Sequence, residues 1–207
     1  MLKTSTPREI QFSSDLPGQI LEDISIILRA PLLKNEPGKG AQEYKMVSIT
    51  DFPDFGFIDI PAKTIKIKQS LAKAEKYHLA PFDVLLTIVG TVGKIGILPE
   101  SFKGRWIPSS NMLAIRFDKH QQENALAFTA FIRSETGIKL LNKLTHGTTI
   151  PIISKKEFAK IVVPKLTVNL KKKMKTLYSK EKKLYDEIEK NKEAINILRK
   201  NYLGEGF

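Results

Sequence analysis

The turn from Gly90 to Lys94 comes nearest, by residue type, to a known chemical motif. Its sequence, Gly-Thr-Val-Gly-Lys, matches part of the glycine-rich loop that holds nucleotide phosphates with backbone amides and one lysine. That loop needs a glycine five positions before the Gly-Lys pair and Ser or Thr after it, and these positions hold Ile88 and Ile95. The spacing argues against a phosphate loop, so a nucleotide-binding enzyme is kept only as an alternative.

Side chains that coordinate metals are few and scattered. The sequence has no cysteine, which excludes disulfide bonds and thiolate metal sites and is typical of a reducing cytoplasm. The three histidines, His78, His120 and His146, are far apart and form no ligand-spaced pair. We therefore expect no metal site, no cofactor and a cytoplasmic location.

Cations and short hydrogen-bonding side chains are instead gathered in the segments expected to be loops. Such groups suit contacts to the phosphates and base edges of nucleic acid. We expect the cations to contact phosphates and the polar side chains to bond bases or backbone, although a solvated hairpin tip has the same composition. The candidate residues are Thr91, Lys94, Lys103, Arg105, Ser109, Ser110, Asn111, Thr148 and Thr149.

The elements expected to carry these loops form one α+β domain over residues 1–165, with a mixed or antiparallel sheet and flanking helices. Its clearest strand is the apolar run 84–89, and residues 95–98 are the expected partner across the glycine-containing turn. The segment that starts at Ile20 is expected to be helical and to become a strand near Ser25.

Periodicity and turn composition predict the other elements of the domain. Strands are expected at 44–49, 57–60, 64–68, 112–117 and 161–163. Helices are expected at 70–76, 126–134 and 136–144, and Ser154 with Glu157 predicts a capping box for another short helix. Segments 31–40 and 145–149 are expected to be loops.

The last forty residues show an unbroken heptad repeat. No Pro or Gly occurs between Pro164 and Gly204, so we expect one helix from about Thr167 to Tyr202, about 54 Å long. We assign residues 166–207 to a helical spacer that mediates dimerisation through the heptad positions, here called the seam. The seam residues are Leu170, Met174, Leu177, Glu181, Leu184, Ile188, Asn191, Ile195, Leu198 and Tyr202.

Two polar seam residues, Glu181 and Asn191, favour antiparallel pairing with a second copy or a sister unit. In a parallel dimer Glu181 would face its own copy, and the basic run 171–183 would also face itself. In an antiparallel dimer whose paired numbers sum to 372, Glu181 meets Asn191 and every other layer is apolar. A surface helix packed on its own domain shows similar spacing and is the alternative.

The charge balance favours a polyanionic partner. The net charge is +12 and the pI is about 9.7, values that are most often associated with nucleic-acid binding. Residues 165–203 carry twelve basic and five acidic side chains, although a lysine-rich helix face is also commonly just solvated. No apolar run approaches the roughly 18 residues of a membrane span, so we expect a soluble protein.

Several short segments resemble those of the specificity subunits of type I restriction-modification enzymes, as one target-recognition domain followed by one helical spacer. The resemblance covers nearly the whole chain from about Gly18, and the order of the segments makes it specific. The segments are Leu21-Glu22-Asp23-Ile24, Ser48-Ile49-Thr50-Asp51, Asp83-Val84-Leu85-Leu86, Gly90-Thr91-Val92-Gly93-Lys94, Ser110-Asn111 and Gly147-Thr148-Thr149-Ile150-Pro151.

This resemblance implies a protein that catalyses nothing but reads double-stranded DNA for separate methyltransferase and restriction subunits. The sequence agrees, because it has no Asn-Pro-Pro-aromatic methyltransferase motif. The family usually holds two such units in tandem, whereas no internal repeat occurs here, which implies a half-length member or a fragment. The spacer also lacks the acidic, glutamine-rich first turn of the family at residues 165–169. A coiled-coil adaptor that does not bind DNA is the second alternative.

Overall fold

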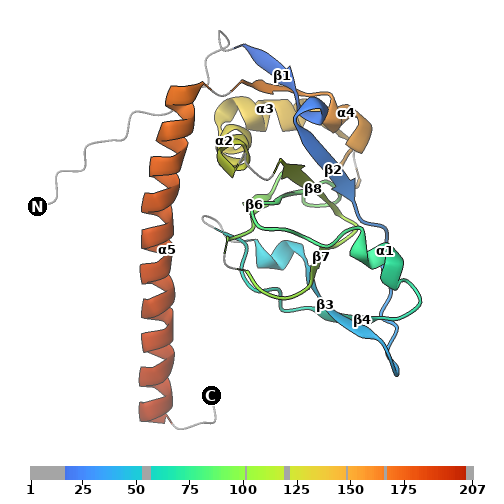
Figure 1. Ribbon diagram of the computed structural model, residues 1–207, viewed down its shortest axis with the longest axis vertical. Helices are drawn as coiled ribbons and strands as arrows, with labels where there is room; N and C mark the ends of the chain where they lie inside the picture. The colour runs from blue at the N-terminus through green and yellow to red at the C-terminus, as the bar shows by residue number, and fades with distance from the viewer. Residues whose placement is uncertain are drawn as a thin grey trace, which may run out of the picture.

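A computed structural model describes residues 17–52, 57–100, 102–118, 122–147, 149–165 and 167–203. It contains a layered α+β domain with one long helix, α5, running along its side (Figure 1). The expected fold class is confirmed. Among the described helices, none combines the length and the apolarity needed to cross a bilayer.

A four-stranded antiparallel sheet forms the centre of the domain. Its strand β5 (Val84–Thr87) is buried at every position, as expected for a continuous apolar run. It pairs with β6 (Ile95–Ile97) as a hairpin in which Val84 lies opposite Ile97. The predicted strand 84–89 ends at Thr87, and Val89 instead forms an isolated bridge to Ile152. In spatial order the strands are β2 (Ser25–Arg29), β8 (Met112–Phe117), β5 (Val84–Thr87) and β6 (Ile95–Ile97).

A second, mixed sheet has the order β4-β3-β7 and lies below the first in Figure 1. Its strands are β3 (Gln42–Val47), β4 (Thr64–Ile67) and β7 (Trp106–Pro108), and β7 runs parallel to β3. The predicted strand at 57–60 was wrong, because only Phe57 forms a bridge, to Ile97. Pro61 follows immediately and has no backbone N–H to continue a ladder.

Short elements complete the domain. The segment from Ile20 contains the expected helix and strand, although the helix is a single 3₁₀ turn, η1. The predicted capping box at Ser154 does not form, because Glu157 turns to His146, at 3.2 Å. A capping box forms instead at η2 (Ile49–Asp51).

The remaining elements are β1 (Gly18–Ile20), η1 (Leu21–Asp23), α1 (Leu71–Glu75), α2 (Gln122–Arg133), α3 (Glu135–Leu144), β9 (Thr145–His146), β10 (Ile152–Ile153), α4 (Lys155–Ala159) and β11 (Val162–Pro164).

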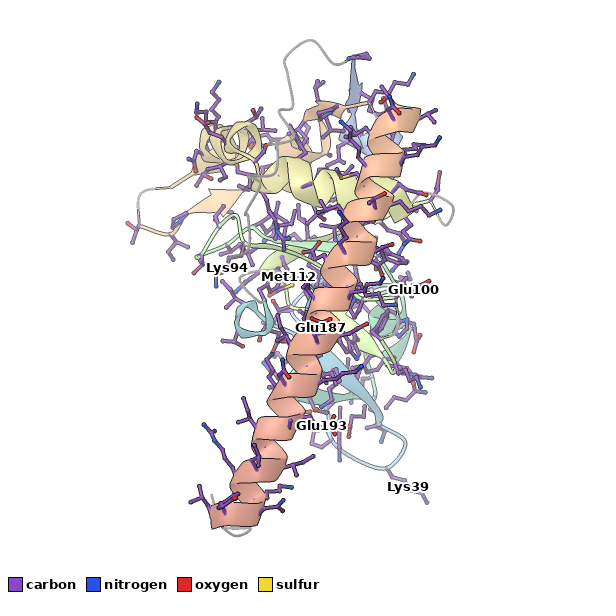
Figure 2. The ribbon with its side chains drawn as sticks, turned by 90° about the vertical axis from the view of Figure 1, so that its left-hand side faces the viewer. Lys39, Lys94, Glu100, Met112, Glu187 and Glu193 are labelled. Atoms are coloured by element: carbon purple, nitrogen blue, oxygen red, sulfur yellow. The ribbon has the colours of Figure 1, made fainter. Side chains whose placement is uncertain are left out.

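The long helix α5 spans Val168–Leu203, so the expected uninterrupted helix is confirmed. Its first turns pack on the domain, where Met174 is 1% exposed and Tyr178 is 7% exposed. Tyr178 contacts Phe57 and Phe82 edge to face, with ring centroids 5.5 and 5.8 Å apart. Residues 191–203 are all exposed, and in Figures 1 and 2 the last turns extend past the domain. The helix therefore packs on its own domain through its first half, and its last turns do not.

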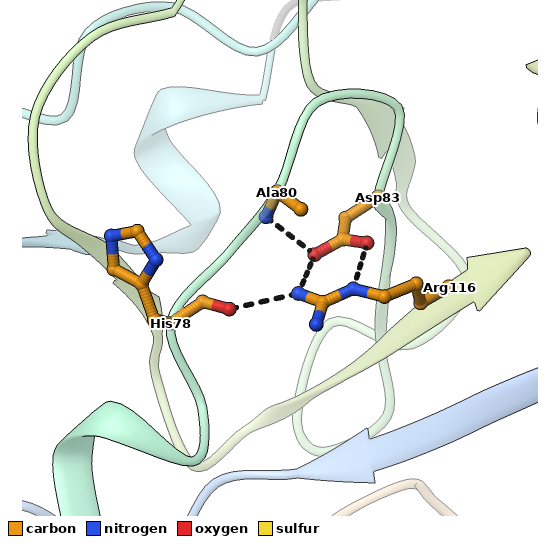
Figure 3. Close-up of polar contacts among 4 residues, drawn as sticks. All are labelled: His78, Ala80, Asp83 and Arg116. Carbon is orange, nitrogen blue, oxygen red and sulfur yellow. Dashed lines mark hydrogen bonds and ion pairs between the residues drawn. The ribbon is translucent and has the colours of Figure 1, made fainter. Parts of the chain in front are cut away.

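An ion pair between β8 and the loop before β5 fixes the entrance to β5 (Figure 3). The Arg116 guanidinium donates to both oxygens of Asp83, at 2.8 and 2.6 Å, and also to the His78 carbonyl oxygen at 2.8 Å. Asp83 is 1% exposed and also accepts the Ala80 N–H. Burial raises the pKa of the Asp83 carboxyl against the opposing effect of Arg116, while the hydrogen bond from Arg116 raises the pKa of that guanidinium. The pair holds β8 against the loop that leads into β5.

We expect Arg116→Met to lower the free energy of unfolding by about 3 kcal/mol, because it leaves a buried carboxylate without its partner. Urea denaturation at pH 7 measures the loss. The double variant Asp83→Asn, Arg116→Met removes the charge but keeps an acceptor for the Ala80 N–H, so it should recover more than half of that loss. A double variant no more stable than the single one contradicts this account of the pair.

Candidate nucleic-acid interface

Backbone hydrogen bonds bring three loops together at one end of the four-stranded sheet. The Gly90 N–H donates to the Pro151 carbonyl oxygen at 3.0 Å, and the Ile88 N–H donates to that of Asn111 at 2.8 Å. The Ile153 N–H donates to the Ile88 carbonyl oxygen at 2.9 Å. Residues 88–94, 109–111 and 149–152 thus lie side by side, and with residues 29–32 they form what we call the loop end.

The 90–94 turn is held in one conformation by its glycines and by Thr87. Gly90 and Gly93 have φ angles of +78° and +92°, which side chains of L residues rarely adopt. The buried Thr87 hydroxyl accepts the Lys94 N–H at 3.0 Å, and the Thr87 carbonyl oxygen accepts the Gly93 N–H at 3.0 Å. Thr91 and Lys94 are exposed on this turn, and Figure 2 shows Lys94 at the edge of the domain.

A groove of about 470 Å³ crosses the loop end. Ser110 and Asn111 line it, and the exposed Thr149 lies on the neighbouring loop. Sequence reasoning missed Arg29 and Leu32, which line the same groove. Arg29 is the last residue of β2 and lies opposite Leu113, two residues after Asn111. Only the pairing of distant strands could have identified Arg29, because the antiparallel register of β2 with β8 is what brings it to these loops.

The cations of the loop end are not neutralised by neighbouring acids. Arg29 and Lys94 are exposed, and within the described part of the chain neither has a carboxylate at ion-pair distance. An unpaired cation keeps its full attraction for a phosphate and releases a counterion when it binds one. The loop end therefore combines free positive charge with the Ser110 hydroxyl and the Asn111 amide.

The structure does not bring Lys103 and Arg105 to the loop end. Both line a cleft of about 820 Å³ between α5 and the second sheet, a cleft that also contains acidic residues, among them Glu43. The Arg105 guanidinium bonds Glu75 at 3.3 Å and lies over the Tyr44 ring at 5.9 Å. A cation already paired with a carboxylate gains less from binding a phosphate.

Other sequence-based candidates have separate surroundings. Ser109 is partly buried, and its N–H donates to the Val47 carbonyl oxygen at 3.0 Å, so it anchors the loop end to β3. Thr148 and His120 lie outside the described residues. His146 pairs with Glu157 on the surface. Among the described residues, no group of three or more His, Asp or Glu side chains is placed to hold a metal ion.

The seam is a second candidate surface, and most of it is exposed. Leu177, Leu184 and Tyr202 are 45%, 61% and 84% exposed, and Asn191, Ile195 and Leu198 are also exposed. Leu170, Glu181 and Ile188 are partly buried, while Met174 is buried in its own domain. At 100° per residue, the exposed seam lies about a quarter turn from the face that carries Tyr178 and Tyr185. Sequence reasoning missed this second apolar face.

The exposed seam continues into a groove of about 510 Å³ between α2 and α5. Leu126 and Ala130 line it from α2, and Leu177 and Leu184 line it from α5. Arg133 and Glu181 lie at the same groove, and the Arg133 guanidinium donates to the Ile95 carbonyl oxygen at 3.3 Å. Burial lowers the pKa of Arg133, and the charge of Glu181 opposes that effect. An apolar side chain could enter this groove without displacing the core.

Comparison with known proteins places this arrangement in a family. The model for the type I restriction modification DNA specificity domain matches residues 20–196. No curated protein matches the chain significantly.

Solved structures with the same fold are distant in sequence. The chain is 11% identical to the S subunit of a type I restriction-modification system from M. genitalium, with a TM-score of 0.59 over 93% of this chain and 45% of that one. It is 13% identical to a chain from a study of assembly and conformational transition of the type I R-M system, with a TM-score of 0.50 over 91% and 43% of the two chains. The chain thus spans less than half the length of these proteins, and the likeness concerns the fold alone.

The two groups of cations predict different responses to salt. We expect Lys94→Ala and Arg29→Ala each to reduce the slope of log K against log salt for duplex DNA by about 0.9, because each removes one phosphate contact. Arg105→Ala, whose guanidinium is already bonded to Glu75, should change the slope by less than half as much. Fluorescence anisotropy across a salt series measures the slopes, and the reverse order would assign the interface to the cleft beside α5.

Proposed function

The chain belongs to the family of type I restriction-modification DNA specificity domains, and from this premise we propose that it recognises a specific sequence in double-stranded DNA without catalysing a reaction. The observation that supports this proposal is the loop end, where unpaired cations lie beside an amide and a hydroxyl on a rigid frame. Phosphate contacts position a protein on the duplex, and contacts to base edges supply specificity. The loop end has side chains for both tasks.

Each side chain of the loop end has a chemical role in this proposal. Lys94 contacts a phosphate as a compact positive charge. Asn111 can pair with the N6 and N7 edge of adenine, and Arg29, like Lys94, contacts a phosphate. Thr91, Ser110 and Thr149 provide shorter hydrogen-bonding groups. Residues 1–165 form the recognition domain and residues 166–207 form the spacer.

The second part of the proposal is antiparallel pairing of α5 with another copy or a sister unit. The exposed seam supports it, because a row of apolar side chains along a free helix end favours a partner. In the same register, the end of the basic run at 180–183 lies opposite residues 189–192, which include Glu189. Met174 is buried, so in this register Leu198 of the partner subunit meets the groove between α2 and α5.

The length of the spacer sets the separation of the two recognition domains. The 36 residues of α5 span about 54 Å, equivalent to about 16 base pairs of duplex. The twofold symmetry of an antiparallel homodimer makes the two half-sites inverted copies of each other. The assembled protein would then dock methyltransferase subunits, and restriction subunits with them, in the cytoplasm, and these partners would supply the chemistry.

A DNA-binding test separates this function from a coiled-coil adaptor. A duplex selected from a random pool should bind at least about 10³-fold more tightly than unrelated DNA at physiological salt, which is the affinity ratio typical of specific binders. Because the adaptor has no base contacts, it would bind all duplexes weakly and with similar affinity. A nucleotide-binding enzyme would instead show a raised melting temperature with nucleotide and magnesium, and the proposed protein should not.

Cysteine crosslinking tests the direction of pairing. The double variant Leu177→Cys, Ile195→Cys should form bridges between chains that join position 177 to position 195, because these seam positions share a layer in the antiparallel register. Mass spectrometry identifies the linked peptides. The single variant Leu177→Cys is the control and should form no covalent bridge between chains under oxidation, because position 177 faces position 195 in this register. A bridge from 177 to 177 would show parallel pairing and contradict the proposal.

A further inference from the structure

Tyr185 is the last residue of α5 with a hydrogen bond or ring contact to the domain, within the described part of the chain. Its hydroxyl donates to the Asp59 carboxylate at 2.5 Å, and its ring meets Phe57 edge to face at 5.8 Å and 89°. Burial, and then the bond to Asp59, raise the pKa of Tyr185, so the hydroxyl keeps its proton near neutral pH. The contact joins two segments that lie 126 positions apart in the sequence.

The helix is otherwise fixed to the domain near its first turns. Met174 and Tyr178 are buried against the domain, and Tyr178 shares Phe57 with Tyr185. Met174 and Tyr178 are one turn apart, about 6 Å along the helix axis, whereas Met174 and Tyr185 are about 16 Å apart. Tyr185 therefore extends the fixed part of the helix more than twofold.

Beyond Tyr185 the helix has room to move. The cleft of about 820 Å³ separates α5 from the second sheet and is lined by Tyr185, Glu189 and Lys192 on the helix side. The next residues, 191–203, are all exposed. From Tyr185 to the end of the helix is about 27 Å without such a contact.

Small changes in the angle of the helix have large effects at its end. The distance from Met174 to Leu203 is about 43 Å along the axis. A tilt of about 10° around Met174 moves the far end by about 7 Å, which is about two base-pair steps of duplex. A spacer attached only at Met174 and Tyr178 would therefore measure DNA poorly.

We propose that the Tyr185 and Asp59 side chains form a latch that fixes the angle between the spacer helix and the recognition domain, and thereby the spacing of the half-sites that a dimer accepts. This inference rests on the proposed function, because it concerns how two recognition domains are held apart. Neither residue touches DNA in this account. Both act by positioning the domain that does.

The latch differs from a contact that only adds stability. It lies at the surface, while the core around Met174 and Tyr178 holds the start of α5 independently. Tyr185→Phe removes only the hydroxyl and keeps the ring on Phe57, so the domain should fold and bind a single half-site as before. The expected change is a weaker preference of the dimer for one separation of the two half-sites.

The experiment measures affinity for duplexes with two half-sites whose separation varies one base pair at a time. Full-length wild-type protein should prefer its best spacing over one displaced by two base pairs by about tenfold or more. Tyr185→Phe and Asp59→Ala should reduce this preference to below about threefold, with affinity for one half-site within about twofold of wild type. Asp59→Asn keeps an oxygen acceptor for the hydroxyl and should retain the wild-type profile.

Ser179→Ala is the matched control, because it removes a hydroxyl from the same helix at an exposed position outside the seam. It should leave the spacing preference unchanged. A wild-type profile in both Tyr185→Phe and Asp59→Ala would overturn the latch while leaving sequence-specific binding intact. A wild-type protein with no spacing preference at all would overturn both the latch and the two-domain reading of DNA.

Discussion

The packing of Met174 and Tyr178 into the domain core is the contact on which the rest of the arrangement depends. It uses one face of α5 for the chain's own fold, and so directs the exposed residues of the seam, about a quarter turn away, toward solvent. A helix with one apolar face could only have packed on its domain or paired with a partner. Because α5 has two such faces, it can be anchored and still offer Leu177, Leu184 and Ile195 to a second helix.

The loop end depends on equally rigid support. The ion pair of Asp83 with Arg116 fixes the start of β5, and the Thr87 hydroxyl closes the turn at the other end of the strand. On the edge of the second sheet, the Glu36 carboxylate accepts the backbone N–H groups of residues 68–70, which hold the pKa of Glu36 at about 2. These hydrogen bonds anchor the segment that contains Glu36, which follows Leu32 in the sequence. The backbone of loops on such a frame has little freedom to lose when they bind.

Strong local patterns predicted much of this fold from the sequence. The heptads gave α5, and the apolar run with its glycine turn gave the β5 and β6 hairpin. The three-residue β7 and the contribution of Arg29 depend on pairing with distant strands, which local periodicity does not contain. The same limit applies to Lys103 and Arg105, which are close to Ser109 in sequence but face a different cleft. Tyr178 and Tyr185 were missed because the heptad pattern drew attention to one face of the helix.

The central claim is that two recognition domains are held apart by an antiparallel pair of α5 helices. Hydroxyl-radical footprinting of the complete protein on its selected DNA tests this claim most directly. The account predicts two protected blocks of inverted sequence, with an unprotected spacer between them and centres about 16 base pairs apart at most. One continuous protected block, or two blocks in direct repeat, would contradict it.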